Sequence, residues 1–395
     1  MQNGTKIKAI LVVITLTVIL YYHVLDNNFA IGGRTNEVHY GSHPKSQSND
    51  ASPHHMLLLD ESVHERIKNT NSSQYTWYGN QWVPPPGIPI FTPRQLKAYY
   101  SKRNILVIGD STSRRFHNTL VNMINAADLD DLKLKEIDRD DFQRRNSCSA
   151  EIGDARYITK MTPGMRPFFK ICRNNTIEVK DSNKEAGNAT AYFSLDQIYL
   201  TCYGAISRLW RDNEEETSAL NEDLAGFKED YDLIIVAAGI WELAAKGVCD
   251  KDEPGTTTQN RTQILLDNLE KNNPDGLQVV FRTSAWDKRF PIDDDLRNSN
   301  ALSYQYFHDL DQKSALGRYQ KNLTLVDWGG VMYSRSYNED RIEGNHPAHY
   351  GIEGRLLFIQ QLTHELVKSE LIAWDVKNGK RGSAIRSSKS PSVRE

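Results

Sequence analysis

The chain has 395 residues, a net charge of −3 and a charged fraction of 25%. This length accommodates one sizeable catalytic domain with appendages, or two small domains. The net charge is nearly neutral and does not indicate a basic surface that would bind nucleic acid, so we expect no nucleic-acid partner. The apolar fraction of 39% is ordinary and predicts a packed core over most of the chain.

The first segment in chain order, residues 9–25, is an apolar run without a charged residue, AILVVITLTVILYYHVL. Its length is near the short limit for a helix that spans a bilayer. Lys6 and Lys8 precede it and Asp26 follows it. The positive-inside rule therefore predicts a signal-anchored, single-pass type II protein, with residues 1–8 in the cytosol and the rest in a lumen. The alternative is a cleaved signal peptide, although no clear cleavage site follows the run.

Two features agree with a lumenal location. Asn-x-Ser/Thr sequons, the acceptors of N-glycosylation, follow the apolar run at Asn71, Asn174, Asn188, Asn260 and Asn322. All four cysteines also follow it, namely Cys148, Cys172, Cys202 and Cys249. They permit two disulfides in an oxidising lumen, with three pairings open, and four buried free thiols are the alternative. Because the chain has no Cys-x-x-Cys pair, we expect no zinc site built on thiolates.

The domain organisation follows from changes in composition. Residues 26–74 are rich in Ser, His, Asn and charge with little periodicity, which predicts a flexible stem. A single ordered domain is predicted for residues 75–370. A Lys-, Arg- and Ser-rich tail, predicted to be disordered, follows at residues 371–395.

Within the ordered domain, short apolar runs alternate with helical patterns. The predicted strands are residues 104–108, 197–203, 233–238, 277–281 and 323–326. Helical periodicity follows Ser111, begins again near Ile264 and returns after Ile352. This alternation predicts an α/β fold of three layers, α/β/α, around a mainly parallel sheet of about five strands. The insertion at residues 128–191 is expected to lie outside the repeating core.

The candidate nucleophile is Ser111, in the sequence Gly109-Asp110-Ser111 directly after the first predicted strand. Ligands of parallel sheets bind at the carboxyl ends of the strands. Unpaired N–H groups at the start of the following helix would stabilise an oxyanion beside the serine. The alternative is that Asp110 or Ser111 only caps this helix. The sequence is not G-x-S-x-G, so the nucleophile elbow of the α/β-hydrolases does not apply.

A base for this serine is predicted in the loop after the last strand, in the sequence DRIEGNHPAHYG. His346 is the candidate general base, and Glu343, three residues earlier, is the acid that would orient it. Asp340 is the alternative acid. A surface loop with two histidines is the plain interpretation, and a metal site built from Glu343, His346 and His349 is a third.

Two further strand ends carry glycines. Gly204 follows the second predicted strand, and Gly239 opens the sequence Gly-Ile-Trp-Glu after the third. Backbone N–H groups at these positions could face the same site, although a glycine after a strand is most often only a turn.

The order of these motifs resembles the SGNH (GDSL-like) hydrolase superfamily: GDS, Gly, G-x-x-E and E-x-x-H-P, each after a successive strand. The segments NQWVPPPGIPIF, GDSTSRR, AAGIWEL and VVFRTSAWD are similar to its PC-esterase branch, which includes polysaccharide and sialic acid O-acetyltransferases. The similarity covers roughly residues 75–368. It implies a flavodoxin-like sheet, Ser111 as nucleophile, His346 as base, and an oxyanion hole formed by the N–H groups of Ser111 and Gly204.

Two residues depart from the superfamily pattern. Trp241 stands at the third oxyanion position, where an Asn is usual, and Glu343 stands where the acid is usually an Asp. The candidates for substrate contact are Asp110, Arg114, Arg115 and Arg282. For the arginines, pairing with nearby acids is the alternative.

The resemblance implies a serine-dependent O-acetyltransferase or acetylesterase that acts on carbohydrate through an acyl-Ser111 intermediate and needs no cofactor. The predicted topology resembles that of Golgi glycan-modifying enzymes and favours transfer, with the acyl donor and the oligomeric state left open. The alternative is a degenerate SGNH domain that binds glycans without turnover. A nucleotide-binding Rossmann-like domain is disfavoured because no Gly-rich loop follows the first strand.

Overall fold

The computed structural model describes residues 59–100, 103–126, 128–129, 156–158, 170–173, 176–179, 191–200, 202–211, 227–240, 242, 249–250, 255–285, 294–313, 317–335 and 350–378. All of these residues fall within one compact unit of the chain, Pro44–Glu395. The predicted membrane anchor, residues 9–25, lies outside them. No helix among the described residues is long and apolar enough to cross a bilayer.

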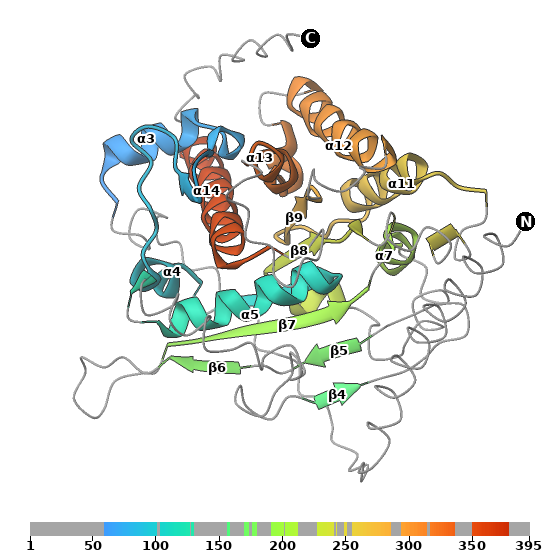
Figure 1. Cartoon of the computed structure of the whole chain (residues 1–395), viewed down its shortest axis with the longest axis horizontal. Coiled ribbons are helices and arrows are strands. Elements are labelled where there is room, and N and C mark those ends of the chain that lie inside the picture. The colour runs from blue at the N-terminus through green and yellow to red at the C-terminus, as the bar shows by residue number, and fades with distance from the viewer. Residues whose placement is uncertain are drawn as a thin grey trace, which may run out of the picture. The chain divides into compact units, whose positions relative to one another are not determined.

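A central sheet organises the described part of the chain (Figure 1). Its five parallel strands lie in the spatial order β7-β3-β8-β9-β10. Their bounds are Asn104–Gly109 (β3), Ala191–Tyr199 (β7), Leu233–Ala237 (β8), Gln278–Arg282 (β9) and Leu323–Val326 (β10). In chain order this is 2-1-3-4-5, the flavodoxin-like order of a doubly wound sheet. The prediction of an α/β fold with five parallel strands is confirmed.

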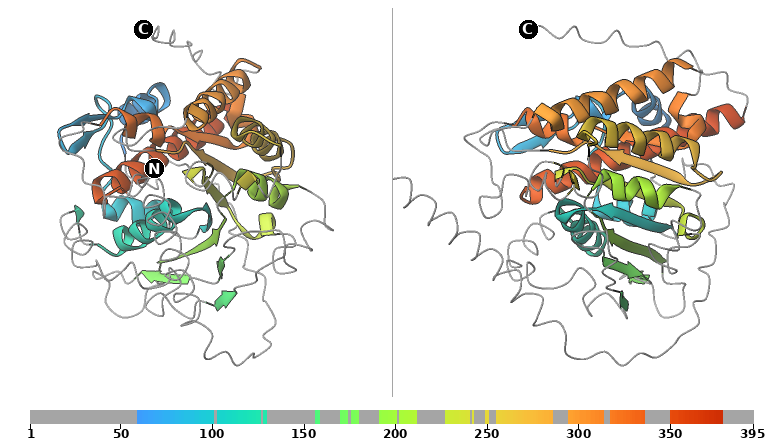
Figure 2. Two further views of the ribbon diagram at one scale, coloured as in Figure 1. Left: turned by 45° about the vertical axis from the view of Figure 1, so that its right-hand side comes forward. Right: turned by 90° about the vertical axis from the view of Figure 1, so that its right-hand side faces the viewer.

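Three short strands extend this sheet beyond β7 in the antiparallel sense, and they lie at its lower edge in Figure 2. They are β4 (Arg156–Ile158), β5 (Lys170–Arg173) and β6 (Thr176–Val179). Both β5 and β6 pair with β7, and β4 pairs with β5. The short strands β4, β5 and β6, all from the insertion at residues 128–191, therefore lie at the edge of the sheet and outside its parallel core.

Helices cover both faces of the sheet. The covering helices are α5 (Ser111–Asn125), α7 (Tyr203–Trp210), α11 (Thr258–Lys271), α12 (Asp294–Lys313) and α14 (Ile352–Lys377). Ile105 and Val107 of β3 pack in one core with α5 and α14, whereas Leu106 and Ile108 pack in a second core with α7, α11 and α12. Alternate residues of a strand point to opposite faces, so the two cores lie on opposite sides of the sheet. This arrangement is compatible with the expected three layers.

The remaining elements lie before β3 or between the main ones. They are α3 (Glu61–Asn69), η1 (Ser72–Gln74), the antiparallel pair β1 (Thr76–Tyr78) and β2 (Gln81–Val83), α4 (Pro93–Tyr100), η5 (Phe227–Asp230), η6 (Gly317–Lys321) and α13 (Trp328–Tyr333).

Polar side chains of α14 bind the chain that precedes β3. The Gln360 amide accepts from the backbone N–H of Phe91 at 2.7 Å and donates to its carbonyl at 2.8 Å. The backbone N–H of Ser72 donates to Glu365 at 2.9 Å, and Gln361 donates to the Ser72 carbonyl at 2.9 Å. Buried hydrogen bonds between segments far apart in the sequence favour one arrangement of the segments that they join. The segment before β3 is thus an integral part of the domain.

The ordered domain is longer at both ends than the sequence predicted. Residues 61–69, expected within the flexible stem, form α3, which Asp60 caps and whose Ile67 is fully buried in the core that contains α14. This helix contains few apolar residues, so its sequence pattern is weak. Short helices are stabilised mainly by packing on the rest of the fold rather than by intrinsic propensity. At the other end, α14 continues past residue 370, and Leu371 is buried. Both boundary predictions, at residues 75 and 370, were wrong.

Two internal elements also differ from expectation. The predicted strand at residues 197–203 is displaced, because β7 ends at Tyr199 and α7 begins at Tyr203. α7 has only eight residues, and its apolar residues continue the apolar run of β7, which hides the boundary between the two elements in the sequence. The sequence did not predict α12, whose buried face includes Ser299 and Ser303 and so interrupts the apolar pattern.

Replacing Ile67 with Ala tests whether α3 belongs to the folded domain. We expect Ile67→Ala to lower the free energy of unfolding by about 2–4 kcal/mol, because it removes buried surface and leaves a cavity. Ile90→Ala is the matched control, since Ile90 is 42% exposed. Urea denaturation of the full chain measures both. Equal stability of the two variants would mean that residues 61–69 do not pack on the domain.

Candidate active site

The carboxyl ends of β3 and β8 form the switch point of the sheet. From β3 the chain passes to β7 on one side, and it then returns beyond β3 to β8 on the other. In doubly wound sheets, ligands bind in the crevice outside this point. Ser111 follows β3 and Gly239 follows β8, so both lie at the switch point, and Gly204 follows the neighbouring β7.

Two glycines allow the loops at the switch point to approach closely. A Cβ atom on Gly109 would lie 2.3 Å from the carbonyl oxygen of Ala237. Gly239 has a φ of +119°, and a Cβ atom there would lie 2.3 Å from the hydroxyl oxygens of both Ser284 and Tyr203. Any larger residue would therefore separate the ends of β3 and β8 or strain the loop between them.

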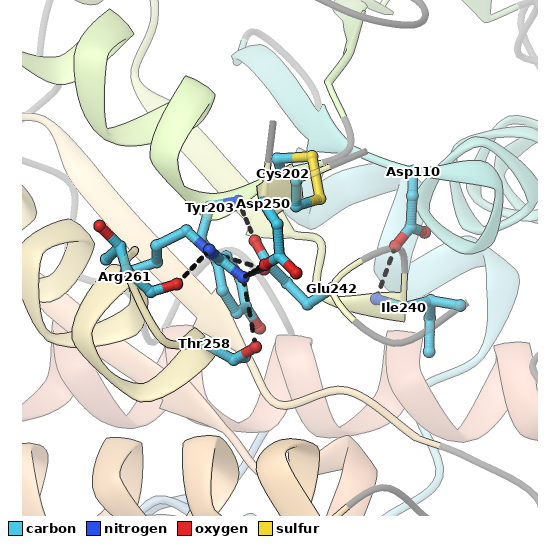
Figure 3. The surroundings of a disulfide bond; sticks show 10 residues. Asp110, Cys202, Tyr203, Ile240, Glu242, Asp250, Thr258 and Arg261 are labelled. Atoms are coloured by element: carbon cyan, nitrogen blue, oxygen red, sulfur yellow. Dashed lines mark hydrogen bonds and ion pairs between the residues drawn. A yellow bond between two sulfur atoms is a disulfide. The ribbon is translucent and has the colours of Figure 1, made fainter. Parts of the chain in front are cut away.

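Asp110 is fully buried and caps α5. Its Oδ1 accepts hydrogen bonds from the backbone N–H and the hydroxyl of Thr112, at 2.8 and 2.6 Å. Its Oδ2 accepts from the backbone N–H of Ile240 at 3.3 Å (Figure 3). The alternative interpretation of Asp110 as a helix cap is thus confirmed. Both oxygens of Asp110 join the loops after β3 and β8, and its contact with substrate stays a prediction.

Ser111 is the first residue of α5 and is half-buried. It therefore lies at the end of a parallel strand and at the start of a helix of 15 residues, as the sequence predicted. The partial positive charge of the helix N-terminus acts at this position, where it favours a negative charge that develops beside the serine.

A second helix N-terminus follows the neighbouring strand. Cys202, the N-cap of α7, makes no side-chain capping bond, and the carboxylate of Glu242 accepts from the backbone N–H of Tyr203 at 2.7 Å instead (Figure 3). Gly204 is the next residue and is buried, and no hydrogen bond joins its N–H to another described residue. A backbone N–H group in this position can donate a hydrogen bond to an oxyanion.

Glu242 is itself held by a buried ion pair with Arg261 of α11. The Nε and Nη2 atoms of Arg261 lie 2.8 and 2.7 Å from one carboxylate oxygen of Glu242, and both residues are at most 1% exposed. Nη2 also lies 3.2 Å from Asp250, and Nη1 donates to the Thr256 carbonyl at 2.6 Å. The pair connects the start of α7, the loop after β8 and α11.

A disulfide between Cys202 and Cys249 lies next to this pair, with a Cα–Cα distance of 5.5 Å (Figure 3). It is one of the pairings that the sequence left open, whereas Cys148 and the side chain of Cys172 lie outside the described part. The two sulfur atoms and a Glu242 oxygen lie within 4.8 Å of one another. Sulfur atoms bonded to each other supply no thiolate, so this cluster does not have the ligands of a metal site.

Arg282, the last residue of β9, reaches across the ends of the neighbouring strands. Its Nη2 donates to the Thr112 hydroxyl at 2.6 Å and to the Ala237 carbonyl at 3.1 Å. Its guanidinium carbon lies 4.6 Å from the ring centre of Trp328 and 5.2 Å from that of Phe358. Because these hydrogen bonds are internal and the residue is only 1% exposed, Arg282 lies beneath the surface of the site and supports the strand ends that form it.

Further hydroxyl groups hold the ends of β8, β9 and β10. Tyr203 and Ser284 donate to the Ala238 carbonyl at 3.2 and 2.5 Å, and burial raises the pKa of the Tyr203 phenol, which keeps it protonated. Asp327 accepts from the Thr283 hydroxyl at 3.0 Å, and burial raises the pKa of its carboxyl to about 6. These groups stabilise the strand ends that lie beneath the site.

The other predicted site residues lie outside the described part of the chain. They are the side chain of Arg114, together with Trp241, Asp340, Glu343, His346 and His349. The pairing of Ser111 with His346 therefore stays a prediction.

The predicted glycosylation sites fall partly within the described residues. Asn71 is exposed at the start of η1, and Asn260 is exposed in the first turn of α11. Asn322 is half-exposed, with a φ of 51°. Asn174 and Asn188 lie outside the described ranges.

Two residues that organise the site, Thr112 and Arg261, were not predicted from the sequence. A cation in the first turn of a helix is unfavourable next to the helix dipole, so Arg261 was a signal for a specific acidic partner. Thr112 carries no comparable signal, because its role depends on a guanidinium that lies 170 residues further along the chain.

Comparison with known proteins leaves the family open, since no protein-family model and no curated protein matches the chain. The fold and the site together define a doubly wound α/β protein with two helix N-termini at its switch point.

Removing the cation of the buried pair tests its structural role. We expect Arg261→Met to lower the free energy of unfolding by about 3–5 kcal/mol, because Glu242 would remain as an uncompensated buried charge. The double variant Glu242→Gln with Arg261→Met should recover part of this loss, since the Gln side chain keeps an acceptor for the Tyr203 N–H. Chemical denaturation measures both, with Arg297→Met on the exposed side of α12 as control. Additive losses in the double variant would contradict the coupling.

Proposed function

We propose that this chain is a serine-dependent O-acyltransferase or esterase that acts on O-acetyl groups of carbohydrate, built on an SGNH-like fold of the PC-esterase branch. The observation that carries the proposal is the position of Ser111 at the N-terminus of α5, at the switch point and beside the N-terminus of α7. The 2-1-3-4-5 strand order supports the same proposal.

In the proposed reaction, Ser111 Oγ attacks the carbonyl carbon of the acyl group while His346 takes its proton. The oxyanion of the tetrahedral intermediate accepts hydrogen bonds from the N–H groups of Ser111 and Gly204, and from the backbone at Trp241. The carbon–oxygen bond to the donor then breaks, and the leaving oxygen takes the proton from His346. Glu343 orients the imidazole.

The second half of the reaction releases the acyl group from Ser111. A sugar hydroxyl or a water molecule attacks the acyl-serine, His346 takes its proton, and the same N–H groups hold the oxyanion. The Ser111 oxygen leaves and recovers the proton. Exclusion of water and the positioning of the sugar decide between transfer and hydrolysis.

The proposal places the enzyme in the lumen of the Golgi or endoplasmic reticulum, anchored through residues 9–25. The disulfide Cys202–Cys249 and the exposed sequon residues Asn71 and Asn260 support a lumenal location.

Replacing the nucleophile tests the proposed function directly. We expect Ser111→Ala to lower the hydrolysis of an aryl acetate, and acetyl transfer to added sugars, by at least about 10³-fold, because no other group can form the acyl-enzyme. Labelling by a fluorophosphonate should disappear in the same variant. Ser62→Ala on the exposed side of α3 is the control and should keep both properties.

The outcome also separates the enzyme from a glycan-binding module. Unchanged turnover in Ser111→Ala would exclude the proposed nucleophile. Wild-type chain that binds glycans but neither turns over acetyl esters nor reacts with the label would favour the degenerate, binding-only domain.

A further inference from the structure

A small cavity lies beside the candidate active site, between the first turns of α5 and α14. Its volume is about 10 Å³, enough for one water-sized group. Three arginines line it, Arg115, Arg282 and Arg355, together with the aromatic rings of Trp328 and Tyr350. Among the described residues, no acidic side chain lines it.

Arg282 is a buried cation that interacts with the Asp110 carboxylate through the Thr112 hydroxyl rather than in a direct ion pair. It is 1% exposed, its Nε has no hydrogen-bond partner, and no carboxylate of the described residues forms an ion pair with it. The nearby Asp110 carboxylate uses its oxygens on Thr112 and Ile240. Burial lowers the pKa of Arg282 to about 10, so the side chain still carries its charge at neutral pH. Buried polar atoms in proteins are normally hydrogen-bonded, so the Nε atom of Arg282 is available to an acceptor held in the cavity.

The N-terminus of α14 adds to the positive potential of this cavity, whereas the Asp110 carboxylate already caps that of α5. Thr112, in the first turn of α5, lines it, and so do Tyr350 and Arg355 at the start of α14. The N-cap of α14 is Gly351, which offers no side-chain capping bond. Helix N-termini attract anions through their unpaired N–H groups and their partial positive charge.

We propose that this cavity binds an oxyanion group carried by an acidic sugar: a carboxylate, a sulfate ester or a phosphate ester. Guanidinium groups match the geometry of such groups, and one oxygen of the anion fits the volume of the cavity. Thr112 adjoins Ser111 in the sequence, so an anchored sugar would lie next to the proposed nucleophile. The assignment of the anion to the acyl acceptor rests on the proposed function, whereas the anion site itself does not.

The test is calorimetric titration of the full-length chain with glucuronic acid, glucose 6-sulfate and glucose 6-phosphate, with glucose as the uncharged control. We expect at least one anionic sugar to bind and glucose not to bind, and the binding to weaken as salt screens the charges. The sugar that binds most tightly identifies the anion. Equal behaviour of glucose and all three anionic sugars would overturn the proposal.

Variants of the lining arginines locate the site. We expect Arg282→Met to weaken binding by about tenfold to a hundredfold, the usual effect of one charged hydrogen bond. Arg115→Gln and Arg355→Gln change half-buried side chains and are expected to weaken binding severalfold even if Arg282→Met does not fold. Arg297→Gln, on the exposed side of α12, should bind like the wild type. Binding that none of the three lining variants affects would place the anion elsewhere and overturn the assignment.

The outcomes for the anion site and for the proposed function are separable. Anionic sugars that bind through these arginines to a chain whose Ser111 is unreactive would support the site and contradict the enzyme. Ser111-dependent turnover of an aryl acetate without any preference for anionic sugars would support the enzyme and contradict the site.

Discussion

One buried guanidinium, that of Arg282, connects the elements that form the candidate active site. Arg282 is the last residue of β9. Its guanidinium donates to the carbonyl of Ala237 in β8 and to Thr112 after β3. It also packs on Trp328 of α13 and on Phe358 of α14. Beyond the last hydrogen bonds of the sheet, side-chain contacts of this kind hold the strand ends in a fixed relative position. A planar group with several donors can bind at two strand ends while its faces contact aromatic rings, which an ammonium group cannot do.

The rest of the site depends on how closely the ends of β3 and β8 approach each other. Because Gly109 has no side chain, the Ala237 carbonyl can lie against it. Asp110 then accepts from the N–H of Ile240 while it caps α5. Ser111 is consequently presented by a fixed strand end, a capped helix and a neighbouring loop. On the other side of β3, the Glu242–Arg261 pair and the disulfide hold the start of α7. Such support is what a preorganised oxyanion site requires, because donors that must reorganise during the reaction stabilise it less.

The sequence predicted the parts of this arrangement that depend on local pattern. Continuous apolar runs marked β3, β8, β9 and β10, because a strand buried on both faces has no polar side. It did not predict α12, where serines occupy a buried face, or α3, which is stable only through contact with the core. Asp110 could be read as a cap or as a ligand contact; the structure shows the cap, and the bond to the N–H of Ile240 adds a long-range contact that local sequence does not reveal. The contact of Arg261 with Glu242 depends on the fold: the sequence marks a cation in the first turn of α11 but does not indicate which acid pairs with it.

The charge of Arg282 is compensated by the Asp110 carboxylate only through the Thr112 hydroxyl. Buried opposite charges often stabilise a folded chain no better than hydrophobic residues of similar volume. Its hydrogen bonds to Thr112 and Ala237 could be made by a neutral donor, so they do not by themselves require a charge. Costly buried groups of this kind are often found at functional sites. A cavity lined by three arginines beside the N-terminus of α14 is where an anionic ligand would be held, and its charge would stabilise the strand ends that present Ser111.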